Sequence, residues 1–271
     1  MALLEDILQS VQAEMSSARV QHSLSDLRLM IADAPPVIAL EKNMRNKFCL
    51  IAEIKEKTPS MGAMRVENVR DAPQAYEHSP VVQAISVLTN FSYFGMSIQR
   101  LGEIRKHSLK PILRKDFIID EYQIWEARAF GADAVLLIAN LLDVSRLRGF
   151  YNLIRELGME ALFEIQTDED ISILPPDAQI IGINSRSFRR KSGVTSRATD
   201  DLKNDFSVDL NTFHLVEKLP VEAIRVAESG LYPATLRYIC SKFQAALVGT
   251  ALLCDKLGVQ SGLADFEAAM R

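Results

Sequence analysis

Four charged residues at the ends of short apolar runs are the first candidates for chemistry in this sequence. Glu53 and Lys55 close one apolar run, while Lys115 and Glu164 each end another. Burying a charged side chain at the end of a strand costs free energy, unless the charge is paired with an opposite one. An unpaired charge at such a position therefore indicates a role in binding or catalysis. Two ammonium groups and two carboxylates at one site would shift each other's pKa values, which suits proton transfer and anion binding. The pattern predicts acid–base chemistry, with a purely structural lattice of ion pairs as the alternative.

A spacing of two residues places two pairs of polar side chains on common faces. In a strand, residues i and i+2 point to the same side. Glu53 and Lys55 share one face in this way, and Asn184 and Arg186 share another. The second pair combines a neutral donor and acceptor with a permanent cation. Both pairs are expected to point into one site, although Glu53 and Lys55 alone would also fit a structural ion pair.

Glycines that follow two later apolar runs predict a phosphate site. The residues at these two positions are Glu228, Ser229, Gly230, Gly249 and Thr250. Glycine lets the backbone approach an anion, and a helix that begins at Thr250 would offer free N–H donors. Ser60, in the segment KTPSMG, is expected to add a hydroxyl group to the same anion. The alternative is that both glycines only form turns.

Strands must position these residues, and the sequence holds eight short apolar or β-branched runs with helical segments between them. One such segment shows helical spacing at Ile124 and Ala127 and stops at Gly131. Strands that alternate with helices form parallel sheets, and eight such units close a (β/α)8 TIM barrel of the α/β class. Its active site lies at the C-terminal ends of the strands. The predicted strands are 48–55, 84–88, 111–115, 134–138, 161–165, 179–184, 224–229 and 245–249.

A single domain is expected over residues 1–271, because barrels of this kind run to roughly 250 residues as one unit. Residues 1–47 precede the first strand and predict an N-terminal helical extension, with two amphipathic helices over one barrel mouth. The segment 189–207 is polar and nearly free of apolar periodicity. It is therefore predicted to be a long loop.

Charge and hydropathy exclude several classes of partner. A formal net charge of −4 offers no basic surface for nucleic acid. The longest apolar stretches, 134–142 and 245–254, are far shorter than the roughly 18 to 20 residues that span a bilayer. The N-terminus lacks the basic start and the cleavage site of a signal peptide. We expect a soluble cytoplasmic protein that binds neither nucleic acid nor membrane. The oligomeric state does not follow from the sequence.

Cysteine and histidine are not arranged for metal or disulfide chemistry. The cysteines form no CxxC pair, and the histidines lie in polar or helical contexts rather than at strand ends. These residues are Cys49, Cys240, Cys254, His22, His78, His107 and His214. Neither a metal site nor a disulfide framework is expected, so the chemistry falls to Lys, Glu, Asn, Arg and Ser.

Five segments that carry these candidates resemble the indole-3-glycerol phosphate synthase family over nearly the whole chain. The third segment is 32 residues long and is highly specific. The segments are LIAEIKEKTPSMG (50–62), AISVLTNFSYFGMS (84–97), PILRKDFIIDEYQIWEARAFGADAVLLIANLL (111–142), IIGINSR (180–186) and VAESGL (226–231). The resemblance implies a phosphorylated small-molecule substrate, 1-(2-carboxyphenylamino)-1-deoxyribulose 5-phosphate, and no cofactor.

The resemblance also implies roles for the candidate residues. Lys115 would protonate the carbonyl oxygen during ring closure, and Glu164 would act as the acid in the loss of water, assisted by Lys55 or Glu53. Asn184 would orient a ribulose hydroxyl or Glu164, and Arg186 would support the carboxylates. The phosphate would lie among Ser60, Ser229, Gly230, Gly249 and Thr250, with Glu228 nearby. The aromatic ring would occupy an apolar slot, for which core packing is the alternative role of each member: Phe94, Phe117, Pro59 and Leu136.

The sequence also departs from the family at several positions. NSRSF stands where the family has NNRDL, the loop that follows is longer, and Met61 and Met96 replace a common Lys and Gly. Two alternatives are compatible with these changes. The barrel would act on a different sugar phosphate, or it would be a non-catalytic partner whose docking surface is 189–207. The retained charged residues argue against the non-catalytic partner.

Overall fold

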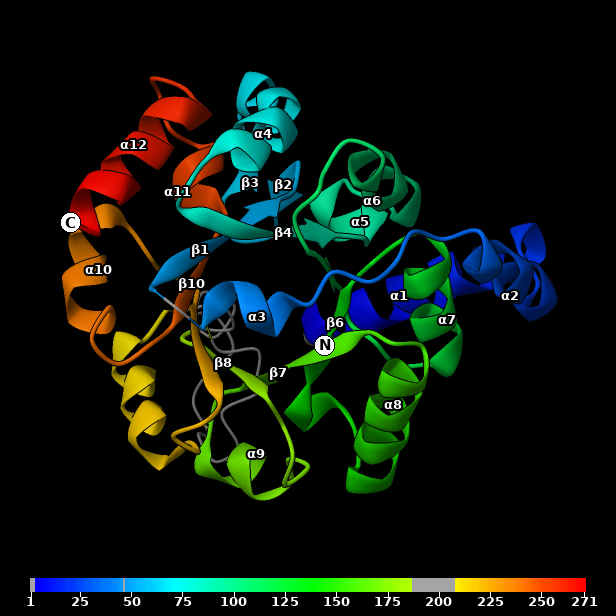
Figure 1. The fold of residues 1–271 in the computed structure, drawn as a ribbon. Helices are drawn as coiled ribbons and strands as arrows, with labels where there is room; N and C mark the ends of the chain where they lie inside the picture. Colours follow the sequence, from blue (N-terminus) through cyan, green and yellow to red (C-terminus); the bar gives the residue numbers. More distant parts are fainter. Residues whose placement is uncertain (1–2, 46, 187–207) are drawn as a thin grey trace, which may run out of the picture.

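A closed barrel of eight parallel strands forms the centre of the molecule (Figure 1). The computed structural model describes residues 3–45, 47–186 and 208–271. Around the barrel the strand order is β1-β10-β9-β8-β7-β6-β5-β4, and every neighbouring pair is parallel. The predicted (β/α)8 TIM barrel is confirmed. The predicted long loop 189–207 lies outside the described residues.

The predicted strands agree with the observed ones to within two residues at every end. The barrel strands are β1 Cys49–Ile54, β4 Val82–Leu88, β5 Ile112–Lys115, β6 Ala134–Ile138, β7 Glu160–Ile165, β8 Ile180–Asn184, β9 Ile224–Glu228 and β10 Ala245–Val248. A short antiparallel hairpin after β1, formed by β2 Lys57–Thr58 and β3 Gly62–Ala63, had no signal in the sequence.

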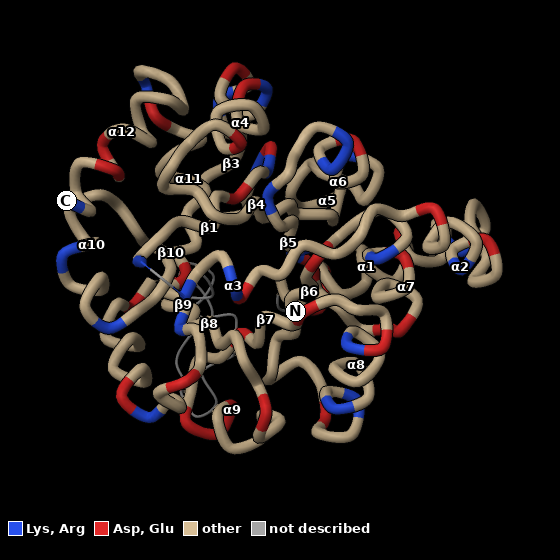
Figure 2. Tube along the Cα trace, viewed as in Figure 1, with Lys and Arg blue, Asp and Glu red and all other residues tan. Residues whose placement is uncertain are grey.

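Helices surround the barrel, as Figure 1 shows. They are α1 Leu3–Gln21, α2 Leu24–Ala32, α3 Leu40–Met44, α4 Val66–His78, α5 Phe91–Phe94, α6 Ile98–Arg105, α7 Glu121–Ala129, α8 Val144–Glu156, α9 Asp168–Ser172, α10 Pro233–Ile239, α11 Thr250–Leu253 and α12 Val259–Ala269. The described residues also include the 3-10 helices η1 Ala139–Leu141 and η3 Leu210–Lys218. In Figure 2, positions of both charges are interspersed along the outer helices. No helix of the described residues is both long and apolar enough to cross a bilayer.

Alternation along each strand separates two apolar layers. In β1, Cys49 and Ile51 belong to the apolar cluster inside the barrel, whereas Leu50, Ala52 and Ile54 pack outward against the helices. A strand buried on both faces reads as a continuous apolar run, which is why the eight runs were visible in the sequence. The same period of two carries the polar residues at the strand ends into the barrel.

The N-terminal extension has three helices, not the two that were predicted, and it contacts both ends of the barrel. At the N-terminal end of the strands, Glu160 Oε2 accepts hydrogen bonds from the N–H groups of Leu40 and Glu41, at 2.5 and 3.0 Å. At the opposite end, the Glu14 carboxylate accepts from the N–H groups of Phe91 and Ser92, both at 3.0 Å. Helix α3 therefore closes the base of the barrel, and α1 lies beside the loop that follows β4.

Helix α7 shows how local sequence sets the ends of an element. Asp120 and Gln123 form a capping box at its N-terminus, which satisfies N–H groups that the helix itself leaves free. The helix ends at Ala129, and Gly131 follows with φ +85°, a backbone conformation that favours glycine. The predicted stop at Gly131 is confirmed.

Candidate active site

The C-terminal ends of the strands enclose a cavity of about 330 Å³. Its position is the one expected for the active site of a (β/α)8 barrel. Every predicted site residue except Ser60 lines this cavity. These residues are Glu53, Lys55, Pro59, Phe94, Lys115, Phe117, Leu136, Glu164, Asn184, Arg186, Glu228, Ser229, Gly230, Gly249 and Thr250. Residues separated by almost 200 positions in the sequence thus meet at one site.

Ser60 is the predicted residue that the structure does not bring to the cavity. It is exposed, and its hydroxyl oxygen lies 3.5 Å from that of Thr58. Thr58 and Met61 line the cavity instead. The hairpin β2–β3 causes this difference, because it sets which residues of the loop after β1 turn inward. The KTPSMG motif offered two hydroxyl groups, and its spacing alone did not distinguish them.

Glu53 and Lys55 form a buried ion pair at the end of β1. The Lys55 ammonium group donates a hydrogen bond to Glu53 Oε1. Burial raises the pKa of Glu53, but the positive charges of Lys55 and Lys115 outweigh it, so the pKa lies below its usual value and Glu53 is a carboxylate at neutral pH. Glu53 therefore contributes a negative charge to the cavity.

Gly249 makes room for this ion pair. A Cβ atom at position 249 would collide with Glu53 Oε1 and would lie 3.0 Å from Lys55 Nζ. Real Cβ atoms do not approach so closely, so a larger residue would displace the pair. The sequence assigned Gly249 to a phosphate site alone, whereas the structure also places it against two candidate catalytic groups.

Lys115 lies between two buried carboxyl groups. Its Nζ is 3.5 Å from Glu164 Oε2 on β7 and 3.7 Å from Glu228 Oε2 on β9. Burial lowers the pKa of Lys115, but Glu164 and Glu228, which are both negatively charged at the alkaline pH where a lysine titrates, raise it above its usual value. Lys115 is therefore a cation at neutral pH, held within reach of a bound ligand.

The pKa of Glu228 is shifted in the opposite direction to that of Glu53. Burial raises its pKa well above the usual value, and the negative charge of Glu164 raises it further, while Lys115 only partly compensates. Neither of its oxygens accepts a hydrogen bond from the described residues. Glu53 and Glu228 thus differ in proton affinity, because the pKa of Glu228 is raised and that of Glu53 is lowered.

Asn184 is the last residue of β8, and Arg186 lies two residues further along the chain. Asn184 Oδ1 accepts a hydrogen bond from the backbone N–H of Arg186 at 2.9 Å. Among the described residues, no hydrogen bond joins Asn184 to Glu164. Arg186 contributes positive charge near Glu53, as its effect on the pKa of that group shows.

The loop after β9 adopts a backbone that exposes N–H groups. Ser229 and Gly230 have φ values of +68° and +66°, and Ser229 is the one non-glycine residue with positive φ in the described parts of the chain. Ser185 Oγ donates to the carbonyl oxygen of Ser229 at 3.0 Å and fixes this turn. Strained backbone of this kind occurs at ligand-binding sites. After the neighbouring strand β10, α11 begins at Thr250, and Thr250 lines the cavity. The first N–H groups of a helix have no partner within the helix itself.

Apolar side chains form the remaining wall. Phe94, Phe117 and Leu136 line the cavity as predicted, and Phe117 is only 6% exposed. The sequence analysis did not identify other members of the lining, because their side chains are ordinary core residues by type. These include Leu88, Ile138, Leu231, Tyr232, Leu247 and Val248. Within the described residues, no three His, Cys, Asp or Glu side chains are arranged to hold a metal ion.

Fold and site together define a TIM-barrel enzyme that carries acid–base groups at the C-terminal ends of its strands. The chain belongs to the indole-3-glycerol phosphate synthase family, whose model matches residues 4–257. The resemblance of the five sequence segments is thus confirmed.

Curated relatives and solved structures are consistent with this assignment. The chain is 37% identical to the indole-3-glycerol phosphate synthase of Arthrobacter sp. (strain FB24), over 99% of the chain and 97% of that protein. It is 42% identical to the protein of the same name from Nautilia profundicola, over 71% of the chain and 69% of that protein. A 3-hexulose-6-phosphate synthase structure from Salmonella typhimurium has a TM-score of 0.59 at 14% identity, with coverage of 83% of the chain and 98% of that structure. That likeness shows the fold alone.

Proposed function

We propose that this enzyme is a carboxy-lyase of tryptophan biosynthesis that converts 1-(2-carboxyphenylamino)-1-deoxyribulose 5-phosphate to indole-3-glycerol phosphate. The observation that carries the proposal is the position of Lys115. Its ammonium group lies close to both Glu164 and Glu228, at 3.5 and 3.7 Å, in a cavity that also holds the Glu53–Lys55 pair. This arrangement supplies the acids and bases that the reaction requires.

The three regions of the cavity match three parts of this substrate. The apolar wall of Phe94, Phe117 and Leu136 suits the aromatic ring. The turn at Ser229–Gly230 and the start of α11 suit the phosphate, because free N–H groups and glycine backbone bind anions. The charged residues lie between these two regions, where the reacting atoms of the substrate would be. Asn184 would contact a ribulose hydroxyl there, and Arg186 would neutralise a carboxylate.

Ring closure requires a cationic acid. The aromatic carbon that bears the carboxylate attacks the ribulose carbonyl carbon, and the carbonyl oxygen gains negative charge and takes up a proton. Lys115 is the residue we assign to this step. Its raised pKa keeps it protonated at neutral pH, and its carboxylate neighbours hold it in place. Loss of carbon dioxide then restores the aromatic ring without further help from an acid.

Loss of water requires an acid for the departing hydroxyl and a base for the anilino proton. We assign the acid to Glu164, which receives the proton it delivers from the neighbouring Glu228, with Glu53 or Lys55 as its assistant. Glu53 can accept a proton because it is a carboxylate at neutral pH. Lys55 is suited to return one, because it already shares a hydrogen bond with Glu53.

A direct assay tests the proposal. Purified enzyme is mixed with the anilino-ribulose phosphate, and the rise of indole fluorescence is followed together with the release of carbon dioxide. We expect both signals to rise together, in equal molar amounts. Substrate that is bound but not converted would contradict the proposal, as would conversion to an isomer without release of carbon dioxide.

A further inference from the structure

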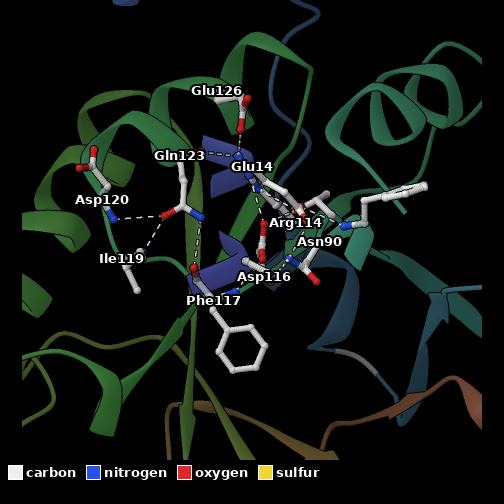
Figure 3. Close-up of polar contacts among 12 residues, drawn as sticks. Glu14, Asn90, Arg114, Asp116, Phe117, Ile119, Asp120, Gln123 and Glu126 are labelled. Carbon is white, nitrogen blue, oxygen red and sulfur yellow. Dashed lines mark hydrogen bonds and ion pairs between the residues drawn. The ribbon is translucent and has the colours of Figure 1, made fainter. Parts of the chain in front are cut away.

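Arg114 and Asp116 flank Lys115 in the sequence. Asp116 borders the cavity beside Lys115, whereas Arg114 does not line it. Because side chains alternate along β5, Leu113 and Lys115 face the barrel interior while Arg114 faces helix α7. Both flanking residues are buried, with Arg114 3% and Asp116 5% exposed. Figure 3 shows them at the centre of a polar network. A buried cation requires partners, and here it has them from several elements.

The Arg114 guanidinium group contacts four side-chain or backbone acceptors. Its Nε donates to Thr89 Oγ1 at 3.0 Å, and its Nη1 donates to the carbonyl oxygen of Gln123 at 2.6 Å. Nη1 also pairs with Glu126 Oε2 at 2.8 Å, and Nη2 lies 3.2 Å from Asp116 Oδ2. The planar fork of arginine thus joins β5 to the end of β4 and to α7.

Asp116 and Thr89 fix the backbone that follows Lys115. Asp116 Oδ2 accepts from the hydroxyl of Thr89 at 2.6 Å, and Asp116 Oδ1 accepts from the N–H of Phe117 at 2.9 Å. The N–H of Thr89 donates to the carbonyl oxygen of Lys115 at 3.3 Å. The two peptide groups that follow Lys115 are therefore held, and with them the direction in which its side chain leaves the strand.

Gln123 extends the network to the loop that follows Lys115. Its Nε2 donates to the carbonyl oxygen of Phe117 at 3.1 Å, and its Oε1 accepts from the N–H groups of Ile119 and Asp120 at 2.8 and 3.2 Å. In Figure 3 the ring of Phe117 projects away from these contacts. That ring lines the cavity. One network therefore holds the backbone of both a cation and an aromatic wall of the site.

We propose that Arg114, with Thr89 and Asp116, is a positioning residue for the reaction, which holds Lys115 between Glu164 and Glu228 and holds Phe117 against the substrate ring. The inference rests on the proposed function, because it assumes that Lys115 takes part in the reaction. Arg114 itself does not line the cavity and acts only through its neighbours. A network that only stabilises the fold is the competing explanation.

A second buried ion pair offers a matched control. Arg105 Nη1 pairs with Asp133 Oδ2 at 2.7 Å, and these side chains are 7% and 2% exposed. Asp133 Oδ2 also accepts from the N–H of Ile112, at the opposite end of β5 from Lys115. The two arginines thus have similar burial and similar partners near one strand, but only Arg114 contacts residues next to the site.

The experiment compares Arg114→Lys, Arg105→Lys and Thr89→Val with the unmodified enzyme. Lysine keeps the charge but cannot reproduce the arginine fork. Valine keeps the branched shape of threonine and removes the hydroxyl that bridges Arg114 and Asp116. The melting temperature, kcat, KM and the pH profile of kcat/KM are measured for each variant with the anilino-ribulose phosphate.

We expect the melting temperature to fall in both lysine variants, and kcat to fall only where Lys115 is displaced. Arg114→Lys and Thr89→Val should lose about tenfold or more in kcat, because a shift of about 1 Å in a reacting group has effects of this order. KM should change less than kcat. The charged groups around Lys115 in the cavity are Glu164, Glu228, Glu53, Lys55 and Arg186, with Asp116 at the border. The glutamates raise the pKa of Lys115, so its displacement from them should lower this pKa. The alkaline limb of the pH profile should then move to lower pH.

The outcomes separate this inference from the proposed function. If Arg114→Lys does not fold, Thr89→Val carries the test. Unchanged kcat and an unchanged alkaline limb in Thr89→Val, or an equal loss of kcat in Arg105→Lys, would overturn the positioning role. The proposed function fails separately, if the unmodified enzyme forms no indole product.

Discussion

At the scale of single residues, the site combines acidic and basic side chains whose pKa values are shifted in different directions. Two lysines and three glutamates face one cavity, and the glutamates are not equivalent. Glu53 has a lowered pKa because Lys55 and Lys115 outweigh its burial, whereas burial and Glu164 raise the pKa of Glu228. Carboxyl groups whose environments separate their pKa values are suited to distinct acid and base roles.

Lys115→Ala is the first substitution that tests this arrangement. We expect a loss of at least about 100-fold in kcat with normal folding, as for removal of a general acid. The measurement is kcat under saturating substrate, with circular dichroism to check the fold. Lys242→Ala is the control, because Lys242 forms an exposed ion pair with Glu217 outside the cavity. Activity of Lys115→Ala within a few-fold of the unmodified enzyme would remove this residue from the mechanism.

The raised pKa of Glu228 predicts a dependence of stability on pH. The folded protein retains a proton on Glu228 that the unfolded chain releases near the ordinary glutamate pKa of about 4.3. The contribution of this group to stability therefore falls as the pH rises from that value towards the folded pKa. A glutamine side chain at this position has no such proton to lose. In Glu228→Gln, we expect the melting temperature relative to the unmodified enzyme to increase between about pH 5 and pH 8, by an amount set by linkage (roughly 1.4 kcal/mol per pKa unit).

Thermal unfolding followed over this pH range measures the effect. Glu222→Gln, on the exposed surface, removes the same type of group without burial and serves as the control. A constant difference in melting temperature between Glu228→Gln and the unmodified enzyme at every pH would show that Glu228 has the same proton affinity in both states.

At the scale of elements, the strands were predictable and the loops were not. Each strand is buried on both faces, so its apolar run is visible in the sequence, and alternation fixes which charged residues at its end turn inward. Ser60 was assigned to the cavity in place of Thr58, because the hairpin β2–β3 depends on pairing between loop residues and has no periodic signal. The short helix α3 was missed for a similar reason, since its cap is Glu160, about 120 residues away.

Gly182 illustrates a strand residue whose role no sequence pattern revealed. It faces the barrel interior on β8, two residues before Asn184, and a Cβ atom there would collide with Glu228 Oε1. Gly182→Ala should therefore push the Glu228 carboxyl group out of its place. We expect kcat to fall by about tenfold or more, for the same geometric reason as above. Gly149→Ala on α8, where a Cβ atom meets nothing within 4 Å, is the matched control and should keep full activity.

A double-mutant cycle shows whether the effect acts through Glu228. Once Glu228→Ala has removed the side chain, Gly182→Ala should have little further effect on kcat, because the contact it would create no longer exists. Losses that multiply in the double mutant would mean that Gly182 acts independently of Glu228, for example through Leu162, whose Cδ1 lies 3.3 Å from the same Cβ position.

At the scale of the whole molecule, one chain closes both ends of its barrel and leaves a cavity among the strand ends. Helix α3 packs Leu40 and Met44 into the interior at the base, while α1 contributes Ile7 and Val11 to the same apolar cluster. Each of these buried side chains adds about 1.5–3 kcal/mol by removal from water. The cavity at the C-terminal ends of the strands is thus set in a packed interior, so a ligand bound there is expected to stabilise the entire fold.

Stabilisation of the fold by a bound ligand can be used to locate the phosphate site. Inorganic phosphate should bind between the Ser229–Gly230 turn and the start of α11 at Thr250, compete with the substrate and raise the melting temperature. A ligand of the folded state stabilises by mass action, by about 2.7 kcal/mol at about 100 times its Kd. Gly249 is a poor choice for the test, because a side chain there would also collide with Glu53 and Lys55.

Thr250→Asp isolates the anion site. An acidic residue in the first turn of a helix favours the helix, so the fold should be retained, while its negative charge repels phosphate. Gln260→Asp makes the same change in charge at an exposed position in the first turn of α12, away from the cavity. We expect phosphate to raise the melting temperature of the unmodified enzyme and of Gln260→Asp, but not of Thr250→Asp, and inhibition by phosphate to follow the same order. If Thr250→Asp keeps both effects, the anion binds elsewhere and the orientation of the substrate in the cavity must be reversed, with its phosphate among the lysines rather than at the helix.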